Sequence, residues 1–433
     1  MTDRRDPIEA WLSSDVEMMP PPPGTFDRVH RRARQRRTMK ALTAAAAAAV
    51  VIAGGVVIPQ LAGGFGTNTS PAAKIKLTLE PRQKSPAPTT VAIPGPPLSP
   101  APGGPPPAAG FLPTSVTFIG GNVGAVIGVA GSCATGPCTA MAATHDYGKS
   151  WSKIGAPPAG PADGRSGVSQ VRFLDFKDGW AYGPALYVTH DGAKSWRAVN
   201  THDGRVIDLS TVGRRAFAVV GFGCTGAGDY YATGCTRFRL FATNASGNEW
   251  DAVPHASGAG QAQSGALQLT SERGYLLAGG RLYTGPAGTG AWHRVSAPLP
   301  ACIRSGASGP QLIAPATSEL FLVCQDPSTS ALTLYRAASS GSFWQRRGMV
   351  EATGGAKSLA VTPSGTLLLA TTTGIYRSAD GRTWSPVLTK PTGGFGFVGM
   401  TNDTNGVAIA ASLRPHVYVT TDGGRTWQAR SIR

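Results

Sequence analysis

The sequence predicts an all-β fold, a seven-bladed β-propeller over residues 111–433, and three observations carry this prediction. Seven of the nine tryptophans end copies of one short pattern, spaced by 45, 54, 42, 52, 40 and 43 residues. Such spacing is typical of a four-stranded propeller blade, about 40–50 residues long. Short apolar or alternating runs bounded by Gly, Pro, Ser or Asn precede each copy, as strands do. With 57 Gly, 35 Pro and only 15% charged residues, the composition favours turns over long surface helices.

The repeated pattern reads Ser/Thr-x-Asp-x-Gly-x-Ser/Thr-Trp. Two copies match at every defining position, a third has Ala for the Gly, a fourth is one residue shorter, and three are decayed. In that order the copies are THDYGKSW (144–151) and TTDGGRTW (420–427); THDGAKSW (189–196); SADGRTW (378–384); and TNASGNEW (243–250), TGPAGTGAW (284–292) and AASSGSFW (337–344).

The residue types of the pattern suit a tight turn followed by a strand. A carboxylate such as Asp146 can accept hydrogen bonds from nearby backbone N–H groups and fix the turn. Gly148 supplies a backbone conformation forbidden to most residues, and Trp151 is expected to pack as an apolar wedge against its neighbours. We therefore expect structural rather than catalytic or metal-binding roles for this set, which also includes Asp191, Asp380, Asp422, Gly424, Trp196, Trp250, Trp292, Trp344, Trp384 and Trp427.

These octapeptides resemble the Asp-box, or BNR, repeats of sialidases, sortilin-type receptors and photosystem-assembly-factor-like propellers. The resemblance covers roughly 320 residues and is specific for the repeat, not for one function. It implies that each box forms the hairpin turn between the third and fourth strands of a blade.

The first 110 residues divide into three segments. Residues 1–40 form a basic tail, residues 41–60 contain the uncharged run ALTAAAAAAVVIAGGVVI, and residues 61–110 form a Pro/Gly-rich linker. The run is at the short end of what spans a bilayer, and the arginines before it predict a cytoplasmic N-terminus. A single-pass plasma-membrane anchor with an extracytoplasmic propeller is therefore expected, and a cleaved signal peptide is the alternative.

The linker cannot bury a core. Thirteen of the 52 residues from Pro59 to Gly110 are prolines. We expect a disordered, semi-extended spacer that holds the propeller away from the membrane.

All six cysteines fall within the propeller. Six cysteines allow fifteen pairings, and the pairing local in sequence is Cys133–Cys138, Cys224–Cys235 and Cys302–Cys324. The spacing lacks the second Cys- or His-rich half of a zinc site, so neither a metal nor a cofactor is expected. In a propeller all three pairs map to the face opposite the boxes, the face that carries the ligand site in related propellers.

The loop between Cys224 and Cys235 contains an acid and two aromatics, Asp229, Tyr230 and Tyr231. These three residues are the candidate binding residues. The alternative is that the disulfides only restrict the loops and protect them from proteolysis.

The resemblance makes a sialidase-like glycoside hydrolase of the exo-α-sialidase type one functional hypothesis. The Arg-Ile-Pro motif that opens that family's catalytic domain is absent. The most similar segment, RFRL beginning at Arg237, does not match it. Residues 111–433 contain only four Glu, at 249, 272, 319 and 351, and Glu249 belongs to a decayed box. No pair of acids across one cleft is marked, so no catalytic residue is assigned.

A non-enzymatic propeller that binds an envelope protein or glycan needs no such constellation and is the favoured hypothesis. A variant in which the cytoplasmic tail reports ligand binding is weaker, because the tail has no recognisable effector motif.

Residues 111–433 contain 27 Lys and Arg against 17 Asp and Glu, an excess of +10. This excess is spread thinly and accompanies no nucleic-acid motif, so no nucleic-acid partner is expected.

Overall fold

The structure, a computed structural model, describes residues 76–79 and 106–433, apart from 134–135, 164–165, 226–233, 245–247, 289, 305–310, 317, 327 and 413. Residues 73–433 form one compact unit. The predicted tail (1–40), membrane segment (41–60) and most of the linker (61–110) lie outside the described residues. Among the residues that are described, no helix is both long and apolar enough to cross a bilayer.

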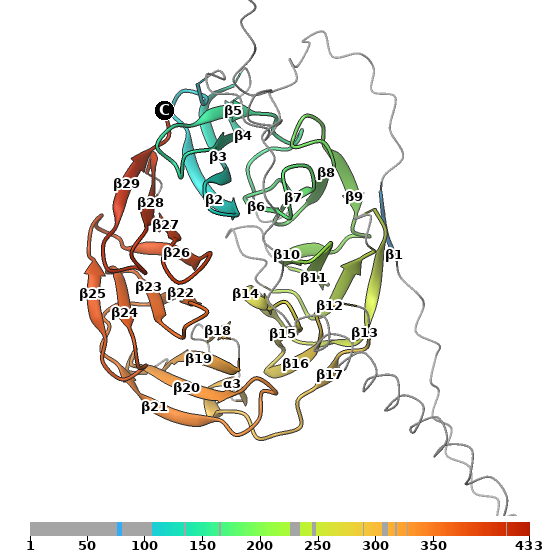
Figure 1. The fold of residues 1–433 in the computed structure, drawn as a ribbon. Helices are drawn as coiled ribbons and strands as arrows, with labels where there is room; N and C mark the ends of the chain where they lie inside the picture. The colour runs from blue at the N-terminus through green and yellow to red at the C-terminus, as the bar shows by residue number, and fades with distance from the viewer. Residues whose placement is uncertain are drawn as a thin grey trace, which may run out of the picture. The chain divides into compact units, whose positions relative to one another are not determined.

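The predicted seven-bladed propeller is confirmed. Seven four-stranded antiparallel sheets surround a central axis, and the first strand of each blade lies innermost (Figure 1). Each blade is one continuous segment of chain. The blades are, in order, β2 (Leu112–Ile119), β3 (Val123–Cys133), β4 (Gly136–Thr144), β5 (Ser152–Ile154); β6 (Gln170–Phe173), β7 (Gly179–Tyr182), β8 (Leu186–Thr189), β9 (Arg197–Asn200); β10 (Arg205–Val212), β11 (Arg215–Phe222), β12 (Arg237–Thr243), β13 (Trp250–Ala259); β14 (Ala262–Leu269), β15 (Arg273–Ala278), β16 (Arg281–Pro286), β17 (His293–Arg294); β18 (Gln311–Pro315), β19 (Glu319–Gln325), β20 (Leu332–Ala338), β21 (Gln345–Val350); β22 (Ala356–Val361), β23 (Leu367–Thr371), β24 (Ile375–Ser378), β25 (Ser385–Leu388); and β26 (Phe395–Met400), β27 (Gly406–Ala410), β28 (His416–Thr420), β29 (Gln428–Ser431).

Two elements lie outside the blades. A one-turn helix, α3 (Ala301–Arg304), follows blade 4, and a short strand, β1 (Lys76–Leu79), lies within the segment predicted to be a disordered linker. β1 pairs antiparallel with both β13 and β9 and joins blades 2 and 3 into one nine-stranded sheet. These four residues of the predicted linker therefore form a strand, and the prediction for the rest of the linker concerns residues outside the described part.

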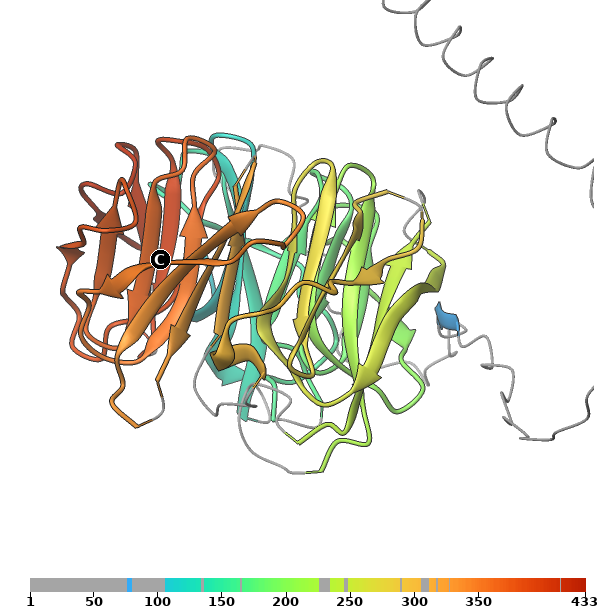
Figure 2. The same cartoon turned by 90° about the horizontal axis from the view of Figure 1, so that it is seen from below.

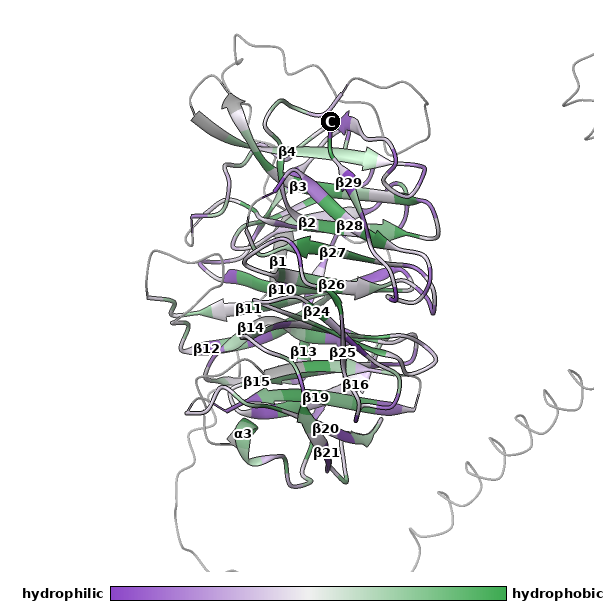
Figure 3. Ribbon diagram, turned by 90° about the vertical axis from the view of Figure 1, so that its left-hand side faces the viewer, coloured by the Kyte–Doolittle hydropathy of each residue, from purple (hydrophilic) through white to green (hydrophobic). Residues whose placement is uncertain are grey.

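The hydrophobic core is divided into seven clusters, one at each interface between adjacent blades. Successive side chains of a strand point to opposite faces of its sheet, so alternate residues enter different clusters. In β11, for example, Val219 packs toward blade 4 and Val220 toward blade 2. Because both faces of a blade are covered, the middle of its second strand is apolar, as in AFAVV of β11, and the hydrophobic colour follows the strands in Figure 3.

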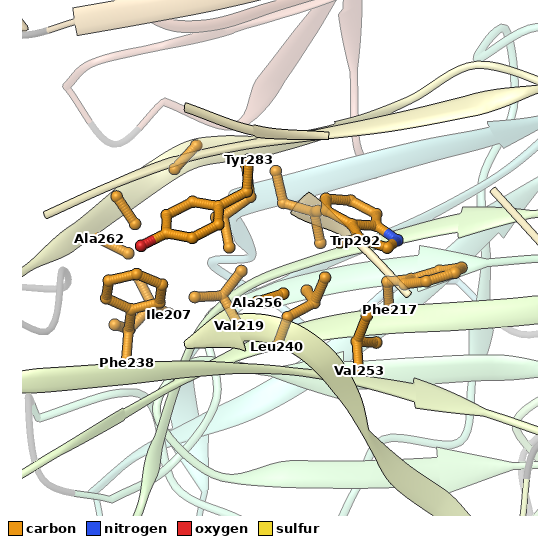
Figure 4. Packing of buried hydrophobic residues seen from close by; sticks show 14 of the residues in the cluster. Ile207, Phe217, Val219, Phe238, Leu240, Val253, Ala256, Ala262, Tyr283 and Trp292 are labelled. Atoms are coloured by element: carbon orange, nitrogen blue, oxygen red, sulfur yellow. The ribbon is translucent and has the colours of Figure 1, made fainter. Parts of the chain in front are cut away.

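Each repeat tryptophan lies just before or at the start of its blade's outermost strand and packs against the preceding blade. Trp292 of blade 4, for example, lies over Phe217 and Val253 of blade 3 (Figure 4). All seven interfaces receive one such tryptophan. Trp151, Trp250, Trp292 and Trp384 are buried, whereas Trp196, Trp344 and Trp427 are half-buried. The repeat therefore supplies one wedge per interface, which explains why its spacing equals the blade length.

The ring closes by side-chain packing between blades 7 and 1, without exchange of a strand between them. Tyr147 of blade 1 reaches into blade 7, and its hydroxyl lies 2.9 Å from the carbonyl oxygen of Gly406 and 2.8 Å from that of Thr420. Burial of this phenol raises its pKa to about 12, although the hydrogen bond to Gly406 opposes the rise. Tyr147 therefore remains a neutral donor that ties the last blade to the first.

Candidate functional site

The alternation of strand direction gives the propeller two distinct faces, seen edge-on in Figure 2. The turns between the first and second strands, and between the third and fourth, lie on one face, which we call the box face. The loops between the second and third strands, and the connections between blades, lie on the other, which we call the stapled face. The described residues of every repeat copy lie at the turn between the third and fourth strands of a blade, on the box face.

In the turn of blade 1, both oxygens of the Asp146 carboxylate accept hydrogen bonds. Oδ1 accepts from the Thr144 hydroxyl at 2.9 Å and from the Ser150 backbone N–H at 2.9 Å, and Oδ2 accepts from the Ser150 hydroxyl at 2.6 Å. The Gly148 N–H donates to the Thr144 hydroxyl at 2.8 Å, with Gly148 at a φ of 80°. The Thr, Asp, Gly and Ser positions of the pattern therefore all have hydrogen-bond partners within the turn itself.

The same bonds recur in blades 2 and 7. Asp191 accepts from Thr189 and Ser195, and Asp422 accepts from Thr420, Arg425 and Thr426. The shorter turn of blade 6 keeps the bonds from Ser378 and the backbone N–H groups of Arg382 and Thr383 to Asp380.

Burial raises the pKa of Asp146, Asp191 and Asp422, but the hydrogen bonds outweigh it and lower all three pKa values; that of Asp422 falls to about 2. At Asp380 the backbone hydrogen bonds from Thr383 and Arg382 are the main cause of a lowered pKa. A carboxylate held ionised in this way is a poor general acid at neutral pH. The arrangement suits a turn clamp rather than a catalytic acid.

The decayed turns replace the carboxylate with other contacts. In blade 3, the Asn244 N–H and side-chain amide donate to the backbone and the carboxylate of Glu249. In blade 5, the hydroxyls of Ser340 and Ser342 lie 2.6 Å apart. These contacts are specific to one turn each, which explains why no shared pattern is readable there.

The cysteines lie on the stapled face as predicted. The Cys224–Cys235 and Cys302–Cys324 disulfides are confirmed. The first closes the β11–β12 loop of blade 3, and the second links α3, after blade 4, to β19 of blade 5. Cys138 of blade 1 is also disulfide-bonded, but the side chain of its predicted partner, Cys133, lies outside the described part of the chain.

The candidate binding residues Asp229, Tyr230 and Tyr231 also lie outside the described residues. The described residues on either side fix the base of their loop. Cys235 is buried, and the Thr225 N–H donates to the carbonyl oxygen of Gly234 at 3.2 Å. The two described ends of the loop are therefore joined by a disulfide and by a backbone hydrogen bond.

A cluster of hydroxyls on the stapled face of blade 6 was not predicted from the sequence. The Tyr376 hydroxyl lies 2.9 Å from the Thr353 hydroxyl and 3.4 Å from that of Thr373, and Thr373 lies 3.0 Å from the hydroxyl of Thr371. Burial raises the pKa of Tyr376, but these hydrogen bonds outweigh it and lower the pKa below its ordinary value. The sequence feature that could have indicated this cluster is the run TTTG (371–374). It begins at the end of an apolar strand and forms the loop between the second and third strands.

The inner strands carry a second polar feature that sequence reasoning missed. Arg172 of β6 donates to the Ser115 hydroxyl of β2 at 3.4 Å, and its guanidinium carbon lies 5.8 Å from the ring centre of Phe397 in β26. Asp208, the one charged side chain that is buried within the described part, accepts from the backbone N–H groups of Leu209 and Leu267, both at 2.9 Å. Both side chains therefore link the inner strands of neighbouring blades.

The four glutamates that a sialidase-like site would draw on are dispersed. Glu249 lies in the box turn of blade 3, Glu272 in the first turn of blade 4, and Glu319 pairs with Arg336 within blade 5. Glu351 is exposed after blade 5. Within the residues that the structure describes, no group of three or more His, Cys, Asp or Glu could hold a metal ion.

The fold and both faces define the class of protein, a seven-bladed β-propeller. No protein-family model matches the chain, and no curated protein matches it. Similar solved structures include YCF48 bound to D1 peptide (18% identity, 60% of this chain and 79% of that chain, TM-score 0.43). They also include streptogramin B lyase, with 10% identity over 70% of this chain and 91% of that chain and a TM-score of 0.49. Saccharomyces cerevisiae Sqt1 is similar too, with 9% identity over 75% of this chain and 97% of that chain and a TM-score of 0.43. At these identities the likeness concerns the fold alone.

Proposed function

We propose that the chain is a non-enzymatic, membrane-anchored propeller of the cell envelope that binds a protein partner through its stapled face. The N-terminus is cytoplasmic, one helix within residues 41–60 spans the plasma membrane, and the propeller is extracytoplasmic. The box turns are those of an Asp-box propeller, in which the carboxylates hold the turns.

The position of the disulfides is the observation that carries this proposal. Both described pairs restrain the stapled face, and Cys138 lies there too. Disulfides persist in oxidising compartments, which supports an extracytoplasmic propeller. A restrained loop also loses less conformational entropy when it binds, which supports recognition on this face.

The hydroxyl cluster of blade 6 adds described side chains to the same face. Thr353 and Thr373 are exposed, and their hydroxyls are oriented by Tyr376. The Thr373 hydroxyl already donates to the carbonyl oxygen of Thr353, so these pre-oriented hydroxyls can accept hydrogen bonds from backbone N–H groups of a partner. Together with the aromatic pair Tyr230 and Tyr231, they provide the mixed polar and aromatic character of protein-binding surfaces.

A crosslinking pull-down from native membranes tests this proposal, with the full chain as bait. The double variant Tyr230→Ala with Tyr231→Ala and the single variant Tyr376→Phe remove candidate contacts on the stapled face. Phe176→Ala and Phe343→Ala are the controls, because these side chains are 48% and 83% exposed on the opposite, box face.

We expect one or two proteins to be recovered with the wild type and with both controls, and to be lost with the tyrosine double variant. Loss with the box-face controls instead would place the partner on the other face and overturn the proposal. Recovery of a polysaccharide without protein would make the partner a glycan.

A further inference from the structure

The outer rim where blades 2 and 3 meet carries a strand from outside the propeller. Thr78 and Leu79 of β1 pair with Asn200 and Val199 at the end of β9, and Lys76 and Leu77 pair with Asp251 and Trp250 at the start of β13. An outermost strand presents a row of unpaired backbone N–H and C=O groups. One four-residue strand therefore extends two sheets at once.

This rim differs from the others. In the part of the chain that the structure describes, β5, β17, β21, β25 and β29 end their sheets without any added strand. Only at the junction of blades 2 and 3 do the described outer strands carry a further strand. The pairing is therefore a property of this junction, not of blade edges in general.

The sequence around β1 has the features of a strand ligand. Apolar residues alternate with polar ones from Lys74 to Glu80, in the sequence KIKLTLE, and Pro71 and Pro81 lie on either side. Proline cannot donate to a sheet ladder, so the strand cannot extend past Pro81. The register also sets Lys76 directly opposite Asp251, and opposite charges at such positions favour pairing.

We propose that the rim of blades 2 and 3 is a strand-docking surface whose ligand is the chain's own segment 74–80, bound in cis, and that docking sets the length of the tether. The tether part of this inference rests on the proposed membrane anchor. With β1 docked, residues 59–75 separate the anchor from the propeller, a reach of roughly 60 Å at about 3.5 Å per residue. Undocked, residues 59–110 do so, with a reach of roughly 180 Å.

The docked strand is short enough to be displaced. It makes two register pairs with each blade, fewer than an ordinary strand of about five or six residues. Docking also closes the 32-residue stretch between β1 and β2, residues 80–111, at a cost in chain entropy that grows with its length. An extended peptide of similar pattern can therefore compete for the same edge.

A labelled peptide of residues 73–81, AKIKLTLEP, tests the docking surface by fluorescence anisotropy. The full-length wild type is compared with the variant Leu77→Pro with Leu79→Pro, which cannot form β1 and changes no residue of the blades. We expect the peptide to bind the proline variant at least tenfold more tightly than the wild type, whose edge is occupied.

Charge reversal is the matched control. Asp251→Lys in the proline variant should weaken peptide binding severalfold, and a peptide with Lys76→Asp should restore it. Equal binding to the wild type and the proline variant, or binding to neither, would overturn the proposal. Concentration-dependent dimers of the wild type that exchange β1 would show that a second copy is the occupant and overturn docking in cis.

The tether is tested separately, with the full chain in lipid nanodiscs and energy transfer from a label at Arg433 to a lipid dye. We expect lower transfer in the proline variant than in the wild type, because the propeller can move further from the bilayer. Unchanged transfer would overturn the tether function. A chain that does not enter the bilayer would contradict the proposed anchor, while the peptide result would still decide the docking surface.

Discussion

Two arcs of the propeller are held together by different means. Blades 6, 7, 1 and 2 are consecutive around the ring and contain the four turns with the aspartate clamp. Blades 3, 4 and 5 lack it and contain the two disulfides of which both cysteines are described, whereas the clamped blades contain one described disulfide-bonded cysteine, Cys138 of blade 1. We call these groups the clamped arc and the linked arc. One fold therefore tolerates loss of its repeat where buried tryptophans and covalent links remain.

The comparison also shows what the repeat is for. The decayed turns have lost the Asp and most hydroxyls, yet each keeps its tryptophan, and Trp250 and Trp292 are only 1% exposed. The tryptophan at the blade interface is therefore retained in the turns that have lost the aspartate. We therefore expect a fully buried tryptophan to contribute most to stability, followed by a disulfide, then by the aspartate clamp or a half-buried tryptophan, and last by the glycine.

The largest effect is expected from Trp292→Ala in the linked arc. Removal of this buried ring leaves a cavity between blades 3 and 4 and should lower the free energy of unfolding by about 3–5 kcal/mol. Trp427→Ala in the clamped arc should cost less, about 1–2 kcal/mol, because Trp427 is half-buried. Urea denaturation of both variants measures the difference, and equal losses would contradict the burial argument.

The second effect is expected from loss of a disulfide in the linked arc. Cys302 and Cys324 are 22 residues apart, and replacement of both by Ser should destabilise the protein by about 3 kcal/mol, mainly through a less restricted unfolded chain. Thermal unfolding of the variant and of the wild type with and without reductant measures this. If reductant lowers the melting temperature of the Cys302→Ser, Cys324→Ser variant as much as that of the wild type, the stabilisation comes from another pair.

The aspartate clamp should matter only where it is present. Asp422→Ala removes the acceptor of bonds from Thr420, Arg425 and Thr426 and should cost about 2 kcal/mol. Asn244→Ala, in the decayed turn of blade 3, should cost less than about 0.5 kcal/mol because its partner Glu249 is exposed. Denaturation of both variants measures the difference. If the free energy of unfolding falls by a similar amount in both, the proposed difference between the two arcs is wrong.

The same clamp predicts a dependence of stability on pH. The pKa of Asp422 is about 2 in the folded protein, against an ordinary value of 3.8, so the unfolded chain binds the proton more readily. The stabilisation is therefore complete above about pH 4 and is lost as the pH falls toward about 2. Unfolding measured across this range should show a shallower slope for Asp422→Asn than for the wild type, and identical slopes would contradict this assignment.

The smallest effects concern the left-handed residue of the turn. Gly148→Ala introduces a methyl group with room around it, 3.4 Å from Trp151, but at a φ of 80°, and should cost about 1 kcal/mol. Ala193 occupies the same position at a φ of 68° and is buried. For Ala193→Gly, relief of strain and loss of a buried methyl group are each about 1 kcal/mol, so the melting temperature should hardly change.

The sequence was sufficient for the fold because the tryptophan period reports the blade length directly. It was also sufficient for two disulfides, because second-to-third-strand loops and blade connections bring local cysteines together. It was insufficient for Arg172, whose partners Ser115 and Phe397 come from the first and last blades. It also missed β1, because the proline content of the surrounding segment masked the alternation in KIKLTLE. Contacts between distant segments leave no local periodicity.

The closure between blades 7 and 1 has a consequence for the order of the chain. Because every blade is one uninterrupted segment and none borrows a strand from another, the ring has no required starting point. A chain that begins at blade 4 and ends at blade 3, with residue 433 joined to residue 106, would retain all seven interfaces. Duplication of about 45 residues would likewise add one complete blade.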